Sequence, residues 1–301
     1  MKKKFLAMAL TVAMALSVMA CGTENGDSEI SQNMEQNNKL AELMNRMEDN
    51  TQEATDEETT EMQADNSVEL TDEYLLSLPE TSADKFWYEE TDDGCIRIEG
   101  IWDNDDVNEV IVIPAQIDGK DVTEISYEAF KFRVLAAVVT GKNVKEIGKG
   151  AFSGAEIKKV LINGPVTEIK ADTFSSTGNS FEEVVLPETI EVIRQEAFRW
   201  AEMKSIVIPA SIKVIECSAF VQTDLEEIHF EGGSGTIEKA AFSMFNADEL
   251  TVYIPDCSLV FDGMSFDDVS VTEGTEITIV TPAGSSAEEV FKASGVNVEN
   301  N

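Results

Sequence analysis

Histidine and cysteine are scarce in this sequence of 301 residues, and their scarcity excludes several kinds of site. The only histidine is His229, and the four cysteines are Cys21, Cys95, Cys217 and Cys257. No Cys-x-x-Cys pair and no Cys/His cluster occurs, so we expect neither a zinc site nor a disulfide framework. At most one disulfide bond can form among the last three cysteines, and we expect free thiols.

Catalytic motifs are also lacking. A histidine-dependent mechanism would have to use His229, which stands where equivalent segments have valine, leucine or tyrosine. Residues 232–236 resemble a nucleophile motif, but Thr236 replaces its last glycine, and the lysine of a phosphate loop is missing. The acidic run 103–106 lacks the distal glutamate of an EF-hand, and we expect a turn there. No cofactor and no metal is expected, and an enzyme is the least favoured class.

Basic residues are few, 22 against 58 acidic residues, and the formal net charge is −36. Such a chain repels phosphate backbones and anionic lipid surfaces, so nucleic acid is not an expected partner. Basic proteins or divalent cations are better electrostatic matches. The acidic surface has a second interpretation, which is that it only keeps the protein soluble.

A long apolar run occurs only near the N-terminus, at residues 5–18, after three lysines. A basic start, a short apolar core and small Ala20 before Cys21 are typical of a secretory signal at residues 1–20. Cysteine directly after the small residue resembles a bacterial lipobox, which implies that Cys21 carries the lipid. The alternative is a transmembrane anchor, but a spanning helix needs about 20 apolar residues. We therefore expect an extracytoplasmic protein on the outer face of the bacterial cell membrane, held there only by this lipid.

Aromatic residues are nearly absent from the next segment. Residues 22–82 contain 17 acidic residues, two basic ones and a single aromatic, Tyr74. Low hydrophobicity with high net charge cannot offset the entropy of ordering the chain. We therefore predict a disordered acidic linker at residues 21–85.

After the linker, a six-residue motif recurs at a nearly constant period. It has the form Ile-x-x-x-(Ala/Thr)-Phe, and its phenylalanines are Phe130, Phe152, Phe174, Phe198, Phe220 and Phe242. The spacing is 22 residues except for one interval of 24. A repeat of this length predicts a solenoid in which stacked coils share one core.

Short segments of alternating hydrophobicity run in phase with the phenylalanines and predict one strand per coil. One apolar row consists of Ile111, Val138, Val160, Val184, Ile206, Ile228 and Val252. Period-2 alternation places this row and the residues two positions later on the same, inward face. The phenylalanines are predicted to fill the widest part of the interior. An aromatic ligand site is the less favoured interpretation.

The repeat resembles the BspA-like leucine-rich repeats of bacterial surface proteins. The resemblance implies a β-rich α/β solenoid, a right-handed stack of leucine-rich-repeat-type coils with short helical or 3-10 turns. It implies an N-terminal cap at residues 86–117, about six coils at 118–256, and a C-terminal cap at 257–301 with a helix. Ser285 with Glu288 forms a capping box for that helix, and Gly295 suits its C-terminal end. The family's function implies recognition or adhesion at the cell surface, with no catalytic residues.

The outward row of the strands is the candidate binding surface. A solenoid sheet offers an extended surface to partners, and we place the site near its C-terminal end. The candidate residues are Lys159, Leu161, Glu183, Val185, Val207, Glu227, His229 and Tyr253. The alternative is ordinary strand packing, because β-branched residues favour strands wherever they occur.

Two functional hypotheses follow. The first is a monomeric, lipid-anchored cell-surface module that recognises or adheres to an extracellular protein or glycan. The second is a passive structural component of the envelope without a specific ligand.

Overall fold

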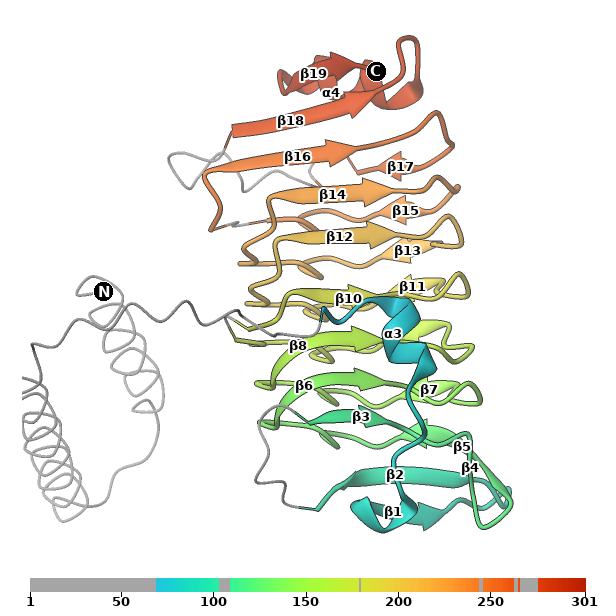
Figure 1. Cartoon of the computed structure of the whole chain (residues 1–301). Helices are drawn as coiled ribbons and strands as arrows, with labels where there is room; N and C mark the ends of the chain where they lie inside the picture. The colour runs from blue at the N-terminus through green and yellow to red at the C-terminus, as the bar shows by residue number, and fades with distance from the viewer. Residues whose placement is uncertain (1–68, 103–108, 179, 244–245, 263–264, 266–275) are drawn as a thin grey trace, which may run out of the picture. The chain divides into compact units, whose positions relative to one another are not determined.

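The computed structural model describes residues 69–102, 109–178, 180–243, 246–262, 265 and 276–301, all within the unit Val68–Asn301. The predicted signal peptide, Cys21, most of the predicted linker and the acidic run 103–106 lie outside the described residues. Within them the chain forms a β-solenoid of about seven turns, which confirms the fold that the repeat predicts (Figure 1).

Each coil contributes one strand to a front sheet, and most coils add a shorter strand to a back sheet. The front strands form two parallel sheets: β3 (Val110–Val112), β6 (Val134–Val139), β8 (Glu156–Leu161) and β10 (Glu183–Val185), then β12 (Ser205–Ile208), β14 (Glu227–Phe230), β16 (Glu249–Tyr253), β18 (Glu276–Thr281) and β19 (Asn297–Asn300). The back strands are β7 (Glu146–Ile147), β9 (Glu168–Ile169), β11 (Val192–Ile193), β13 (Val214–Ile215), β15 (Thr236–Ile237) and β17 (Val260–Phe261). Equivalent positions of successive coils therefore lie side by side in register.

The six repeat phenylalanines form a continuous column through the interior. Every one of them is fully buried, and successive ring centroids lie 5.2, 5.3, 5.1, 4.7 and 4.8 Å apart with nearly parallel planes. This spacing matches the separation of about 4.8 Å between neighbouring strands, because each coil adds one ring. The column is core packing, as predicted, and not a ligand site.

The turns that precede the front strands repeat one backbone conformation. Two residues per turn have positive φ, and one of these columns consists of Phe132, Gly154, Ser176, Trp200 and Gln222. Its backbone N–H groups donate to carbonyls of the next coil, for example Phe132 N to Ser153 O (3.1 Å) and Ser176 N to Arg199 O (2.7 Å). These turns form one edge of the stack, at the left ends of the front strands in Figure 1. We call it the turn edge.

The ends of the stack carry non-repeating elements. At the N-terminal end β1 (Phe86–Glu90) pairs antiparallel with β2 (Ile96–Ile101), and β4 (Gln116–Ile117) pairs antiparallel with β5 (Lys120–Ile125). At the C-terminal end, helix α4 (Ser286–Ser294) lies between β18 and β19 in the chain. The Ser285 hydroxyl accepts the Glu288 N–H at 3.1 Å, and Gly295 adopts φ 81°, so the predicted start and end of the helix are confirmed.

The last part of the predicted linker is folded. Residues Asp72–Ser77 form helix α3, Ala83–Lys85 form a 3-10 helix, and Thr81 hydrogen-bonds to Val112 in both directions (2.8 and 2.9 Å). The predicted boundary at residue 86 is therefore wrong for these residues. The leucines at 70, 75 and 78 are too few to form a core of their own. They pack instead against an apolar surface of the solenoid.

Candidate functional site

The predicted binding row lies in register across the front strands. Leu161 is paired with Val185 on neighbouring strands β8 and β10. Val207, His229, Tyr253 and Val280 then follow one another across β12, β14, β16 and β18. Side chains two residues before them form the more polar row that includes Lys159, Glu183 and Glu227.

The first half of this row is covered by the chain itself. Residues 70–81, which we call the strap, cross the outer face of β3, β6, β8 and β10 (Figure 1). Leu75 of α3 is fully buried against Ala137, Val139 and Leu161, and Leu161 is only 4% exposed. Leu161 and Val185 therefore do not belong to an open surface, which corrects the prediction for these two residues.

Lys159 is also part of the strap contact. Its Nζ lies 2.6 Å from a carboxylate oxygen of Asp72 on the strap and 2.6 Å from one of Glu183 on the neighbouring strand. Burial would lower the pKa of Lys159, but hydrogen bonds to these two carboxylates outweigh it and raise the pKa. The ammonium group of Lys159 thus links the strap to the sheet, and both of its carboxylate partners belong to this chain.

The second half of the row is open to solvent. Val207 is 49% exposed, and the rings of His229 and Tyr253 stack with centroids 4.2 Å apart and planes 9° from parallel. His229 Nε2 lies 2.9 Å from a carboxylate oxygen of Glu227. Four of the eight predicted site residues therefore form a continuous surface, which we call the open face: Val207, Glu227, His229 and Tyr253.

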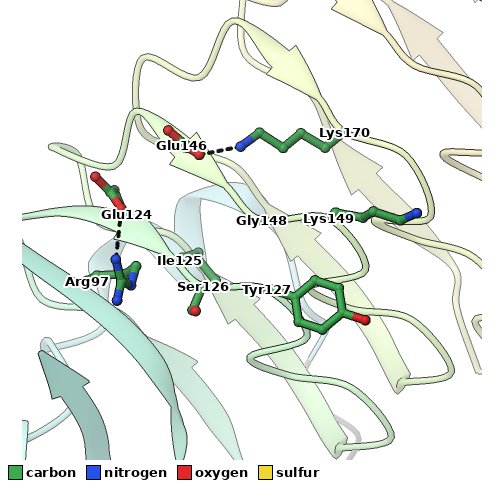
Figure 2. Close-up of a pocket in the computed structure, with 9 residues that line it drawn as sticks. All are labelled: Arg97, Glu124, Ile125, Ser126, Tyr127, Glu146, Gly148, Lys149 and Lys170. Carbon is green, nitrogen blue, oxygen red and sulfur yellow. Dashed lines mark hydrogen bonds and ion pairs between the residues drawn. The ribbon is translucent and has the colours of Figure 1, made fainter.

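A hollow of about 350 Å³ lies elsewhere, on the back of the first coils (Figure 2). The hollow forms because its floor has Gly148, which lacks a side chain. The equivalent residues of later coils have long side chains: Lys170, Arg194, Glu216 and Glu238. A Cβ at Gly148 would lie 2.4 Å from the carbonyl carbon of Ser126, so no side chain fits there.

The charged groups around the hollow are paired with one another. Figure 2 shows Arg97 beside Glu124 and Lys170 beside Glu146, and Lys149 Nζ lies 3.2 Å from Asp172. The side chains present both charges to solvent and leave no unpaired charge to select an ion. The sequence analysis missed this hollow. The two small residues Ser126 and Gly148, in a column of long side chains, were the signal for it.

The described residues contain no group of three or more His, Cys, Asp or Glu side chains arranged to hold a metal ion. Cys95, Cys217 and Cys257 are each partly buried and are not joined by disulfides. No helix in the described part of the chain combines the length and apolar character that crossing a membrane requires.

A family model described as a BspA type leucine rich repeat region matches residues 120–252 in six copies. A search of curated protein sequences finds no match.

Among solved structures, a leucine-rich repeat protein of T. pallidum is 23% identical, with 59% of this chain and 86% of that chain covered and a TM-score of 0.45. A leucine-rich repeat protein of Bacteroides ovatus is 19% identical, with 74% and 67% covered and a TM-score of 0.42. A leucine rich cell surface protein of Faecalibacterium prausnitzii is 16% identical, with 75% and 95% covered and a TM-score of 0.26.

Proposed function

Because residues 120–252 form a BspA-type leucine-rich repeat region, we propose that this protein is a recognition module that binds an extracellular protein through the open face. The N-terminal signal and Cys21 support display at the outside of a bacterial membrane through a lipid. The observation that carries the proposal is that the strap covers the front strands β3 to β10, whereas Val207 on β12 is 49% exposed and no other described segment crosses β12 to β16.

The open face has the composition of a protein contact. Exposed apolar area rimmed by charge marks interaction surfaces, and tyrosine is enriched among residues that dominate binding energy. Val207 supplies apolar area, Tyr253 and His229 supply a rigid stacked pair, and Glu227 supplies a charge beside it. Because strands keep these side chains in register, the surface is pre-organised and loses little entropy on binding.

The test uses the double variant Val207→Asp, Tyr253→Ala. The purified folded unit is screened by surface plasmon resonance against extracellular matrix and plasma proteins, and the variant is then titrated against each protein that binds. We expect about a tenfold or greater loss of affinity, since both changes fall on the centre of the surface. The melting temperature should change little, because neither side chain is fully buried.

The matched control is Val260→Asp, which changes an exposed valine of β17 on the back sheet. This variant should bind as the wild type does. Equal affinities of the double variant and the wild type would remove the binding role from the open face. Absence of any saturable binding would favour the alternative, a passive structural component of the envelope.

A further inference from the structure

All three tryptophans of the chain are exposed, and so is Phe132 among the phenylalanines that the structure describes. Trp87, Trp102 and Trp200 have exposed fractions of 55%, 59% and 43%, and Phe132 is 71% exposed. The repeat phenylalanines are all fully buried, so the fold readily places aromatic rings inside. These four rings contribute little to the core, and their positions call for another explanation.

Phe132 and Trp200 also occupy a backbone position that suits neither residue. Both lie in the positive-φ column of the turn edge, with φ of 58° and 59°, where other coils have Gly154, Ser176 and Gln222. A bulky residue with positive φ is strained, and such strain concentrates at functional sites. Exposure and strain both act against stability at these two positions, so stability does not account for the aromatic side chains.

Each of the two rings is laid across the next coil in a defined orientation. The Phe132 ring lies on the backbone of Gly154, since a Cβ there would come within 2.3 Å of the Phe132 Cε1 atom. Trp200 donates its indole N–H to Gln222 Oε1 (2.6 Å), and the Arg199 guanidinium lies 4.1 Å from the ring centroid. The rings are therefore pre-oriented platforms and not freely rotating side chains.

The other two tryptophans extend the same edge beyond the first coil. Trp87 and Trp102 stack with centroids 6.5 Å apart and planes 25° from parallel. Arg133, which follows Phe132, donates from Nη2 to the carbonyl of Ile101, which precedes Trp102 (2.9 Å). This hydrogen bond connects the turn that carries Phe132 with the segment that carries Trp102, and the edge has exposed rings at Trp102, Phe132 and Trp200.

The spacing of the rings favours a linear polymer. Phe132 and Trp200 are three coil steps apart, or about 14 Å at the usual strand separation. At the two column positions between them stand Gly154 and the exposed Ser176, neither of which carries a large side chain. A protein contact would instead need a contiguous buried centre. Separated flat rings suit sugar units, whose C–H faces pack on aromatic rings while their hydroxyls stay hydrated.

Charge selects among polymers. Nucleic acid also stacks on aromatic platforms, but a chain with a net charge of −36 repels it. The basic groups at the edge do not offset this, because Lys131 pairs with Glu128 at 2.6 Å and Arg199 with Glu196 at 2.8 Å. We infer that the turn edge binds an uncharged polysaccharide, whose sugars stack on Trp102, Phe132 and Trp200. This surface is separate from the open face.

The test is gel retardation of the protein by embedded polysaccharide, with xyloglucan, galactomannan and laminarin as neutral probes and hyaluronan as the acidic comparison. We expect at least one neutral probe to retard the wild type and hyaluronan to have no effect. In Phe132→Gly, Trp200→Gly the affinity should fall about tenfold, because two stacking surfaces are removed. The melting temperature should not fall much, since glycine relieves positive-φ strain.

Ser176→Gly is the matched control, because it changes the same column without removing a ring, and it should be retarded like the wild type. Retardation by no neutral probe, or equal retardation of the double variant, would overturn the inference. A second measurement keeps Phe132 and Trp200, so it does not depend on whether the variant Phe132→Gly, Trp200→Gly folds. In Trp87→Phe the two remaining tryptophans, Trp102 and Trp200, both belong to the proposed site, and their emission should shift when the retarding polysaccharide is added. Unchanged emission would also overturn it. A failure of the open face to bind protein would not change the retardation by polysaccharide, so the two proposals can be tested independently.

Discussion

Residue by residue, the stability of this protein rests on one kind of contact repeated along the stack. Each of the four inner repeat phenylalanines packs face to face with the phenylalanine of the coil before and of the coil after. The preceding residue is Ala or Thr, and Ala197 and Ala219 are fully buried. Small residues there let the coils approach closely enough for the rings to touch, so each inner ring stabilises two coil interfaces.

Phe198→Ala is expected to lower the free energy of unfolding by about 3–5 kcal/mol, the usual range for a buried Phe. Its ring lies 5.1 Å from Phe174 and 4.7 Å from Phe220, so truncation leaves a cavity in the middle of the column. Urea denaturation of the folded unit measures the loss. Tyr127→Ala, which removes a 62% exposed ring, is the control and should change stability by less than about 0.5 kcal/mol. Similar losses for both variants would show that the column is not the main source of stability.

Among the elements, the strap and the C-terminal helix each pack on the solenoid through a contact that does not repeat along the stack. The strap covers the front sheet from β3 to β10 and so limits the open face to the strands that follow. The helix α4 supplies the buried side chains Ala287 and Phe291 at the other end of the stack. Each is a single, non-repeating contact, unlike the coils between them.

Leu75→Ala is expected to loosen the strap, because Leu75 is its only fully buried side chain in α3. The free energy of local opening should fall by about 2 kcal/mol, the lower end for a buried leucine. Hydrogen exchange of the amides of residues 75–81 measures it. Leu76→Ala changes the neighbouring leucine, which is 53% exposed, and should leave exchange nearly unaltered. Equal exchange rates in the two variants would mean that the strap is held by the ion pair between Asp72 and Lys159.

The C-terminal cap should depend on acid pH. Hydrogen bonds from Lys292, the Gly284 N–H and Asn300 lower the pKa of Glu288 from 4.5 to about 2. Because the folded state favours the ionised carboxylate, its stabilising contribution is present above pH 4.5 and is lost as the pH falls toward 2. Amide protection of α4 should therefore decrease over that interval.

Glu288→Gln should show weaker protection at neutral pH and little further loss in acid. Glu289→Gln, one residue along, should keep the pH dependence of the wild type. If α4 protection were independent of pH in the wild type, the hydrogen bonds of Glu288 would not couple to the cap.

As a whole molecule, the protein is a stack whose stability comes from contacts between neighbouring coils, and both proposed binding sites are on its outer surfaces. The open face lies on the front strands β12–β16, and the aromatic rings lie on the turn edge. A lipid on Cys21 would hold this stack near the membrane through the segment that precedes the strap. In that arrangement the domain presents two separate surfaces to its surroundings.

Cys21→Ser is expected to abolish labelling by a fatty-acid probe and to shift the protein from the membrane fraction to the unprocessed precursor or the medium. The reason is that the thiol of Cys21 is the proposed site of lipid attachment. Cys95→Ser, within the folded unit, should change neither labelling nor fractionation. Labelling that persists in Cys21→Ser would place the lipid, or the anchor, elsewhere.

The sequence by itself determined the coil, its core and the ends of the last helix. These features are local, because an alternating strand, a buried phenylalanine and a capping serine depend on a few neighbouring residues. The repeat motif also occurs six times, which is too often to be a coincidence. The open half of the candidate site was predicted for the same reason, since Val207, His229 and Tyr253 hold equivalent positions in successive coils.

Only the tertiary structure decided which part of the front sheet is covered, and where single deviations from the repeat come together. Leu75 meets Leu161 across a separation in sequence that no periodicity encodes, so an acidic segment that looked like linker proved to be the cover of Leu161 and Val185. Phe132, Trp200 and Gly148 each differ in residue type from their neighbours in the same column. What such a residue does depends on its neighbours in the adjacent coils, because stacking, and not sequence order, determines what it contacts.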